Sequence, residues 1–284
     1  QLTGLIGLNH KQQEAQFSDK ISVDLTDYFL NLLYETNGFF EAQAGARLSE
    51  HSTYGSNWTY HINPSLYFNF DSVYLRFHAS MSSAFIAPSL YKLFDTYSGN
   101  QTLKPETNQS LEFGGSLFFP NGGQFQLVYF SRDHQNFVEY NMTTFRYTNA
   151  PRDFGVYGTE FLCSYPLTDR LLLQTNYAYT QHEEGEGLRI PKHKVNTSFR
   201  QQLNSNTQLL TSIQFVGDRD DKVGQDLVVL SSYWLLDFRI SHQLSEPGVS
   251  LFGSIENVFD ANYEEVCGYT TRGRNLSVGV SYAF

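Results

Sequence analysis

Apolar and polar residues alternate with a period of two along nearly the whole chain, and this alternation is the feature that most limits the fold. Successive side chains of a β-strand point to opposite faces of a sheet, so the pattern predicts strands with one apolar and one polar face. The segments 171–180 and 234–241 follow it, and helical periodicity is nearly absent. The final segment shows it most clearly, with one face formed by Leu276, Val278, Val280, Tyr282 and Phe284.

Composition supports β-structure and argues against several classes of protein. Aromatic residues make up 16% of the chain and are almost all Phe and Tyr, which strands favour. The net charge of −10 predicts no nucleic-acid partner, because proteins that bind nucleic acids present basic faces. No run approaches the roughly 18 apolar residues of a transmembrane helix. Cys163 and Cys267 are too few for a disulfide framework or a CxxC metal site, and we expect two free thiols.

Turn-forming residues divide the chain into about fourteen strands. The expected strands are 1–12, 20–34, 37–49, 57–69, 72–82, 110–119, 123–140, 145–165, 171–181, 192–202, 206–216, 229–243, 249–263 and 274–284. Every second connection is a tight turn rich in Asn, Gly, Asp or Pro: 35–38, 69–72, 120–123, 167–170, 204–206 and 245–248. The other connections are mostly longer and polar: 13–19, 50–56, 83–109, 182–191 and 217–228, with shorter ones at 141–144 and 264–273.

Connection length distinguishes two architectures that share this alternation. A soluble sandwich buries its apolar face, whereas a membrane barrel turns that face to lipid and its polar face to a wet lumen. Regular alternation of short and long connections is typical of transmembrane β-barrels, and aromatic residues near strand ends, such as Phe68, Phe118 and Tyr165, suit a girdle at the membrane interface. The sequence therefore favours an all-β, transmembrane antiparallel barrel, in which we expect extracellular long loops, periplasmic short turns and a periplasmic C-terminus.

The last eight residues carry a separate signal. Gly279, Tyr282 and Phe284 resemble the C-terminal sorting signal of bacterial outer-membrane proteins, and the chain ends on the aromatic residue. This resemblance implies outer-membrane lipid and the outer-membrane assembly machinery as partners. The alternative is an ordinary edge strand that ends in Phe.

Two longer stretches resemble the TonB-dependent outer-membrane receptors. In the stretch 85–115 the matching residues are Phe85, Ala87, Pro88, Leu93, Gly99, Asn100, Leu103, Lys104, Pro105, Glu106, Glu112 and Gly114. Towards the C-terminus they are Asn257, Phe259, Asp260, Tyr263, Gly268, Tyr269, Gly273, Arg274 and Phe284, and Gly217-Asp218-Arg219 also fits. The Gly-Tyr-x-Thr-x-Gly-Arg segment at 268–274 tilts the resemblance towards the cobalamin-receptor branch.

The resemblance implies a barrel of about 22 strands that encloses an N-terminal plug preceded by a TonB box. Residues 1–284 contain neither element, so we expect one partial barrel domain that corresponds to the C-terminal fourteen strands. The remaining strands and the plug would come from a missing or separate chain, and the TonB energy-coupling complex would act through that plug. A fragment, one part of a split receptor and a smaller complete barrel all stay open.

Catalytic motifs are lacking, and we expect no enzyme activity. His182 is followed by two glutamates but not by a second His four residues later, so it begins no HExxH zinc site. Neither a Gly-x-Ser-x-Gly elbow nor a phosphate-binding Gly-Lys-Ser/Thr loop occurs. No cofactor is expected beyond a possible Ca²⁺ ion in the acidic segment Asp218, Asp220, Asp221 and Asp226. A solvated acidic loop is the favoured interpretation of that segment.

Aromatic and cationic residues of the long connections are the candidate ligand contacts, because rings supply contact area to a large ligand. They are Tyr54, Phe85, Tyr91, Phe94, Tyr97, Arg219 and Tyr269. The competing interpretation is a loop that packs its own aromatic residues. The leading functional hypothesis is import of a scarce, bulky nutrient, with cobalamin first and a ferric siderophore second. A structural scaffold in an outer-membrane complex and an unplugged passive pore are the alternatives.

Overall fold

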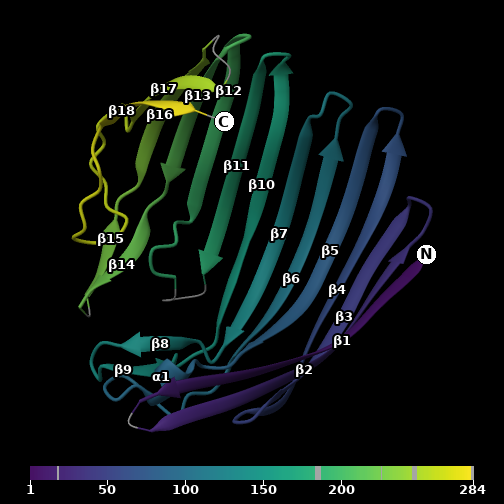
Figure 1. Ribbon diagram of the computed structural model, residues 1–284, viewed down its shortest axis with the longest axis vertical. Coiled ribbons are helices and arrows are strands. Elements are labelled where there is room, and N and C mark those ends of the chain that lie inside the picture. The colour runs from purple at the N-terminus through teal and green to yellow at the C-terminus, as the bar shows by residue number, and fades with distance from the viewer. Residues whose placement is uncertain (18, 183–186, 225, 245–247, 283–284) are drawn as a thin grey trace.

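A single antiparallel sheet dominates the computed structural model, which describes residues 1–17, 19–182, 187–224, 226–244 and 248–282 (Figure 1). The sheet has 14 strands, and each pairs with its neighbours in chain order. Its strands are β1 (Leu2–Gln16), β2 (Lys20–Glu35), β3 (Phe40–His51), β4 (Gly55–Phe70), β5 (Val73–Ile86), β6 (Glu106–Phe118), β7 (Gln124–Gln135), β10 (Phe154–Thr168), β11 (Leu171–His182), β12 (His193–Asn204), β13 (Thr207–Val216), β16 (Tyr233–Gln243), β17 (Val249–Glu256) and β18 (Asn275–Tyr282).

Three short elements lie outside this sheet. Helix α1 (Leu90–Phe94) follows β5, the hairpin β8 (Val138–Asn141) and β9 (Arg146–Asn149) follows β7, and the hairpin β14 (Arg219–Val223) and β15 (Asp226–Leu230) follows β13. All three lie at the same end of the long strands (Figure 1). The described residues contain no helix of the length and apolarity needed to cross a lipid bilayer.

The expected strand count and antiparallel pairing are confirmed, but several predicted boundaries are wrong. The prediction leaves only a short connection between the strands 123–140 and 145–165. In the structure the connection is longer, because β7 ends at Gln135 and β10 begins at Phe154. Residues 138–141 and 146–149 do form strands, but they pair with each other instead of extending the main sheet. The segment 226–230 likewise pairs with 219–223, so the strand expected at 229–243 begins at Tyr233. Alternation identifies a strand without identifying its partner.

The ends of other strands also differ from the prediction. The strand expected at 249–263 already ends at Glu256, because Asn257 and Asp260 adopt positive φ angles of 50° and 53° that an extended strand does not allow. Strand β5 continues to Ile86 and β6 begins at Glu106, so the loop between them is shorter than the expected 83–109. At the other end β1 extends to Gln16, which leaves only a tight connection to β2.

Glycine makes the tight turns possible where the backbone needs a left-handed conformation. Gly122 has a φ angle of +81° in the connection between β6 and β7, and its amide donates to the carbonyl of Phe119 at 3.0 Å. The amide of Phe119 in turn donates to the carbonyl of Gly123 at 2.8 Å. The turn is therefore closed by its own backbone, and the expected position of the turn at 120–123 is confirmed.

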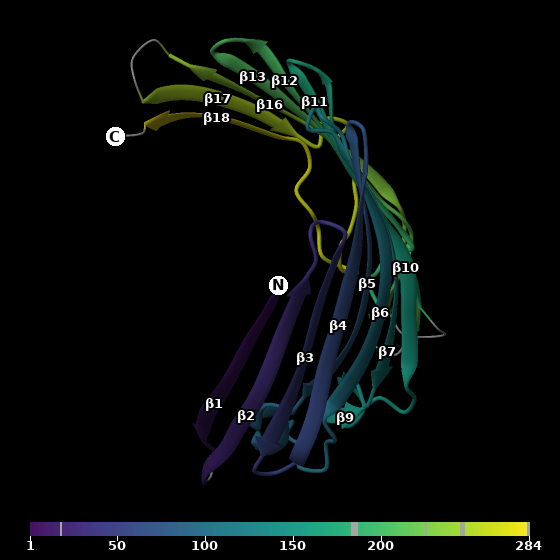
Figure 2. The ribbon, with the colours of Figure 1, turned by 90° about the vertical axis from the view of Figure 1, so that its right-hand side faces the viewer.

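The sheet is curved but not closed. Strands β1 and β18 stand at the two ends of the strand order, and both edges turn towards the same side of the molecule (Figure 2). An open edge presents unpaired backbone groups, which a bilayer does not tolerate. The fourteen strands thus form part of a barrel wall, as the partial-barrel prediction required.

The two faces of the wall differ in chemistry. Register places Phe77 opposite Leu66 on one side and Gly115 on the other, within a face whose large apolar side chains are exposed. On the opposite face, Ser80 stands across from Glu112 and its hydroxyl donates to the amide oxygen of Asn63 at 2.8 Å. In a membrane barrel the first face meets lipid and the second lines the lumen. We call them the apolar face and the polar face.

Aromatic rings on the polar face lie across glycines of the adjacent strand. In each case the ring and the glycine are direct cross-strand partners, and a Cβ added at the glycine would overlap the ring. The pairs are Phe29 with Gly7, His61 with Gly45, His78 with Gly114, Phe130 with Gly158 and Phe252 with Gly279. The ring covers backbone that the glycine leaves bare.

Candidate functional site

The polar face offers neutral hydrogen-bonding groups. A shallow depression of about 510 Å³ crosses strands β10 to β16. Its polar lining includes Gln174, Asn176, Asn196, Ser198, Ser212 and Gln214. Asp237 and Arg239 also occupy this face, where the guanidinium of Arg239 lies 4.4 Å from the centre of the Phe252 ring. Amides and hydroxyls can both donate and accept, so most of this lining can contact a polar solute of any charge, and Asp237 adds one carboxylate to it.

A first loop cluster covers the loop end of strands β1 to β10. It consists of the turn 52–54, the loop 87–105 and the hairpin segment 136–153. Its centre is a small core formed by Leu93, Leu103 and Val138, against which Phe94 and Tyr147 pack. Burial of these side chains holds loops from different parts of the chain together.

Helix α1 is fixed at both ends by side chains. The hydroxyl of Ser89 accepts the amide of Lys92 at 3.3 Å at the N-terminus. Past the C-terminus, the carboxylate of Asp95 accepts the amide and the hydroxyl of Ser98 at 2.8 Å and 2.7 Å. These bonds from Ser98 lower the pKa of the Asp95 carboxyl below its ordinary value. The Leu-Tyr-Lys-Leu-Phe segment is therefore a defined structure.

Hydrogen bonds join this loop to its neighbours. The side chain of Asn149 on β9 accepts the amide of Lys104 at 2.9 Å and donates to the carbonyl of Lys104 at 3.0 Å. Asn100 donates to the carbonyl of Tyr147 at 2.9 Å. The hydroxyl of Tyr54 donates to the carbonyl of Leu103 at 3.0 Å, and burial raises the pKa of that phenol.

The structure assigns different roles to the five predicted aromatic contacts in this region. Tyr97 and Tyr91 are exposed, with 86% and 54% of their surfaces accessible. Phe94 packs on the small core, and its ring centre lies 6.4 Å from that of Phe17. Tyr54 ties the loop down, and Phe85 belongs to strand β5 instead of the loop. Only Tyr91 and Tyr97 therefore present their rings freely to solvent from α1 and the segment after it.

A second loop cluster covers the loop end of strands β11 to β18. It combines the β14–β15 hairpin with Arg189 and the loop 257–274. Asp221 is its centre, because its fully buried carboxylate accepts the side chain of Arg189 and the amides of Lys222 and Cys267, each at 2.8 Å. Burial pushes the pKa of the Asp221 carboxyl upwards, but these donors hold it below its ordinary value.

Arg219 is also a structural residue of the second loop cluster. Only 5% of its surface is accessible, and its guanidinium donates to the carbonyls of Gly217, Ser231 and Glu264. It also lies 5.2 Å from the centre of the Tyr233 ring. Tyr269, in contrast, is 71% exposed on the loop 257–274. The side chain of Arg219 joins the β14–β15 hairpin to the loop 257–274, and this hairpin lies over a different part of the sheet from α1 (Figure 1).

The acidic segment does not gather its carboxylates. Within the described residues, no group of three or more His, Cys, Asp or Glu side chains is arranged to hold a metal ion. Asp218 accepts the amide of Ser232 at 2.6 Å, while Asp221 is engaged by three donors. Calcium binding by Asp218, Asp220 and Asp221 stays a prediction.

The residues predicted as an assembly signal lie on or beyond β18. Gly279 is the partner of Phe252, and 64% of the Tyr282 surface is exposed on the apolar face. Phe284 and the turn residues 245–247 lie outside the described residues. Cys163 and Cys267 are both free thiols, one on β10 and the other in the second loop cluster, as expected.

Comparison with known proteins identifies the wall. Residues 5–258 match the family model described as TonB dependent receptor-like, beta-barrel. The chain belongs to the TonB-dependent receptor family. The barrels of this family are outer-membrane proteins, and the antiparallel meander with loops at one end is their wall.

The similar proteins are named for different ligands. The vitamin B12 transporter BtuB of Vibrio cholerae is 26% identical over 248 residues, which cover 85% of this chain and 40% of the transporter. A variant of the ferric enterobactin receptor PfeA from Pseudomonas aeruginosa superposes with a TM-score of 0.81 at 19% identity, over all of this chain and 51% of the receptor. The siderophore receptor PirA from the same species gives 0.81 at 21% identity, again over the whole chain and 52% of the receptor. The chain thus spans about two fifths to half of the proteins it matches.

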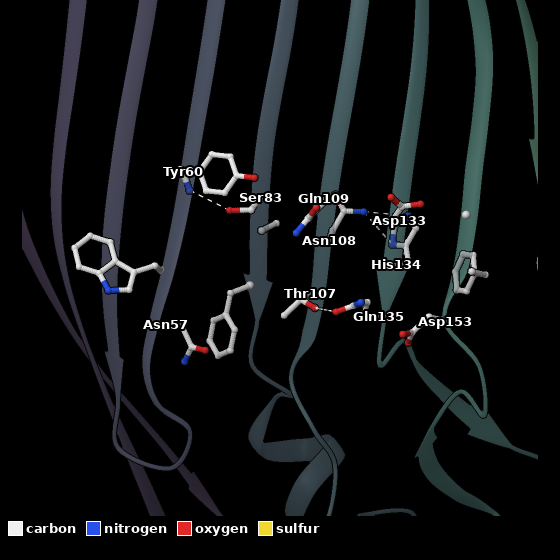
Figure 3. Close-up of a pocket in the computed structure, with 15 residues that line it drawn as sticks. Asn57, Tyr60, Ser83, Thr107, Asn108, Gln109, Asp133, His134, Gln135 and Asp153 are labelled. Carbon is white, nitrogen blue, oxygen red and sulfur yellow. Dashed lines mark hydrogen bonds between the residues drawn. The ribbon is translucent and has the colours of Figure 1, made fainter.

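One feature of the wall has no signal in the sequence pattern. Between β4 and β5, near the loops, lies a hollow of about 540 Å³ whose lining includes Trp58, Tyr60 and Gln109 (Figure 3). Its residues come from five successive strands of the main sheet and are spread over residues 57–155, so no local motif marks them. Trp58, one of the two tryptophans of the chain, is exposed there, a fact that only the structure supplies.

Proposed function

We propose that this chain forms the wall and the external loops of a TonB-dependent importer for a scarce, bulky nutrient. Cobalamin is the first candidate and a ferric siderophore the second. The observation that carries the proposal is the combination of a polar barrel face with two ordered loop clusters at one end of it. The similarity to the vitamin B12 transporter supports cobalamin, and the fold shared with siderophore receptors keeps the second candidate.

Exposed aromatic rings of the two loop clusters bind the ligand first. Tyr91 and Tyr97 in the first cluster and Tyr269 in the second present the most accessible of the predicted aromatic contacts. Phe94 and Arg219 serve these contacts indirectly, because they hold the loops in shape. A large ligand that meets several rings gains contact area from each, and the neutral amides of the polar face line its route inwards.

The proposed importer needs partners that complete the ring and supply energy. Further strands must join the edges of β1 and β18, since unpaired backbone is not stable in hydrocarbon. A plug within the completed barrel would carry the contact with the TonB complex. The outer-membrane assembly machinery would insert the wall, and the loop end would face the outside of the cell.

The test is ligand binding by the assembled receptor with its plug. Replacement of both Tyr91 and Tyr97 by Ala should weaken binding of the correct ligand at least about tenfold, since loss of two aromatic contacts exceeds about 1.4 kcal/mol. Cyanocobalamin and a panel of ferric siderophores are the ligands, measured by equilibrium binding to outer membranes. Phe39→Ala, an exposed aromatic residue at the turn end, is the matched control and should leave affinity unchanged.

Three results would count against the proposal. Equal affinities of the double variant and the parent receptor would show that Tyr91 and Tyr97 do not contact the ligand. Failure of the parent receptor to bind any ligand of the panel would favour a scaffold. Conductance through the unliganded protein in planar bilayers would favour a passive pore.

A further inference from the structure

Strands β4 and β5 separate before they reach the loops. Their ladder ends at the pair His61–Ser82. On either side the neighbouring ladders continue, from β3 to Gly55 of β4 and from β6 to Ile86 of β5. In place of a ladder bond, the amide of Tyr60 donates to the hydroxyl of Ser83 at 3.0 Å (Figure 3). Near the loops, β4 and β5 therefore no longer pair with each other, although each stays paired with its other neighbour.

The hollow of about 540 Å³ lies at this separation and spreads over β6, β7 and the start of β10. Cross-strand register places much of its lining in two rows. One row contains Ser83, Gln109 and Asp133, and the next contains Phe85, Thr107 and Gln135. Thr107 donates to the side-chain oxygen of Gln135 at 3.2 Å, which aligns the second row.

These rows continue the apolar face, because the residues two positions along each strand share a face. Next to the first row, towards the turns, that face contains Met81 and Leu111, followed by Phe113 and Tyr129. On β5 and β6 the apolar band thus gives way to a hydroxyl and an amide within a single step along the strands, and on β7 the polar residues already begin at Ser131, beside Leu111. Such a change marks the edge of the hydrocarbon region on the outside of a barrel.

The lining combines flat aromatic surfaces with neutral polar groups. Trp58 is 69% exposed, and Tyr60 and Phe85 lie beside it at the separation. Around them stand amide and hydroxyl side chains and two carboxylates, Asp133 and Asp153. Among the described residues of the lining there is no Lys or Arg, so an anionic group would meet repulsion without compensation.

We propose that this hollow binds an uncharged sugar ring. A sugar presents hydroxyls that donate to carboxylates and exchange hydrogen bonds with amides, and its C–H faces pack on aromatic rings. The lining residues alone support binding of a sugar. The source of the sugar depends on the proposed function, in which this wall lies in a membrane. A sugar at the edge of the hydrocarbon region is the head group of a glycolipid, and the alternative source is a free oligosaccharide.

The two tryptophans of the chain allow a direct test. Trp234→Phe leaves Trp58 as the only indole of this chain. Trp58→Phe leaves Trp234, which is also exposed on the apolar face but whose ring centre lies 4.6 Å from that of Phe215. The assembled receptor carrying either substitution, with any tryptophan outside this chain also replaced by Phe, is titrated with maltotriose in detergent. In the second arm it is reconstituted into phospholipid nanodiscs with or without a diglucosyl diacylglycerol.

Saturable quenching of Trp58 emission, with no change in Trp234 emission, is the expected result. A response to maltotriose identifies a soluble sugar as sufficient, whereas a response only to the glycolipid identifies a membrane head group. Gln109→Ala and Asp133→Asn should each raise the apparent dissociation constant at least about threefold. Ser116→Ala is the matched control, because Ser116 lies on β6 like Gln109 but outside the hollow.

The inference is overturned if Trp58 emission responds to neither sugar while heat-modifiable gel mobility shows a folded barrel. An equal response of Trp58 and Trp234 would also overturn it, because that indicates a general effect of the added lipid. Failure here is distinguishable from failure of the importer proposal. Binding of the nutrient is measured with variants of Tyr91 and Tyr97, which belong to the first loop cluster, and Trp58 is not part of that cluster.

Discussion

The ring of His78 lies across Gly114, its direct partner on the neighbouring strand, so closely that a Cβ at position 114 would overlap the imidazole. We therefore expect Gly114→Ala to force the ring from its place and to destabilise the wall by about 1–3 kcal/mol, the usual cost of overpacking. Heat-modifiable gel mobility and urea denaturation measure the loss. The adjacent Gly115→Ala is the control, because its Cβ would meet Phe77 at an ordinary 3.5 Å.

If Gly114→Ala and Gly115→Ala unfold at the same urea concentration, the ring contact contributes nothing specific. A double variant, Gly114→Ala with His78→Ala, should recover part of the stability, since the overlap disappears with the ring. Absence of any recovery would point to the backbone at position 114 instead of the ring.

Asn149 holds the first loop cluster together through its two bonds with Lys104 and a third to the carbonyl of Asn136. Asn149→Ala should free the loop 87–105, because each lost bond removes about 0.5–1.5 kcal/mol. We expect cleavage of that loop by added protease to accelerate about tenfold or more, as 1.4 kcal/mol corresponds to one decade. Met142→Ala, an exposed residue at the tip of the same hairpin, should leave the rate unchanged.

Asp221 makes the second loop cluster sensitive to acid. The pKa of its carboxyl is lower in the folded protein than the roughly 3.9 of an unfolded chain, so its contribution is complete above pH 4 and is lost as the pH falls further. Hydrogen-exchange protection of residues 219–230 should therefore drop between pH 5 and pH 3. Asp221→Asn should show low protection at both values, whereas the exposed Asp226→Asn should follow the parent protein.

The two ends of the wall should lie on opposite sides of the membrane. In a background with Cys163→Ser and Cys267→Ser, single cysteines at Tyr97 and Asn121 report the loop end and the turn end. A membrane-impermeant maleimide should label Tyr97→Cys in intact cells and Asn121→Cys only after the outer membrane is opened. Labelling of Asn121→Cys in intact cells would reverse the proposed orientation.

Much of the wall follows from local sequence rules. Alternation in segments such as 276–282 identifies strands and their apolar faces, and residues such as Gly122 identify the turns. Those rules fail at 136–153, because β8 and β9 alternate like wall strands and yet pair with each other. Pairing is a property of two segments, and periodicity describes only one.

The candidate site was less accessible to prediction from sequence. Exposed Tyr91 and Tyr97 could be selected as aromatic residues of a long loop, but the same reasoning selected Phe94, which packs inwards. The charge of Arg219 suggested a ligand contact, whereas its guanidinium is used by backbone carbonyls of its own neighbourhood. Burial is decided by residues distant in the chain, such as Val138 beside Leu93.

Every strand of the main sheet between the two edges pairs with the main-sheet strand before it and the main-sheet strand after it in the chain. Each new hairpin therefore finds its template in the one already formed, and the wall can grow by stepwise zippering without a search among distant segments. The same arrangement makes circumference an adjustable property. Addition or removal of one hairpin changes the width of the curved wall while the pairings and connections away from that point stay as they were.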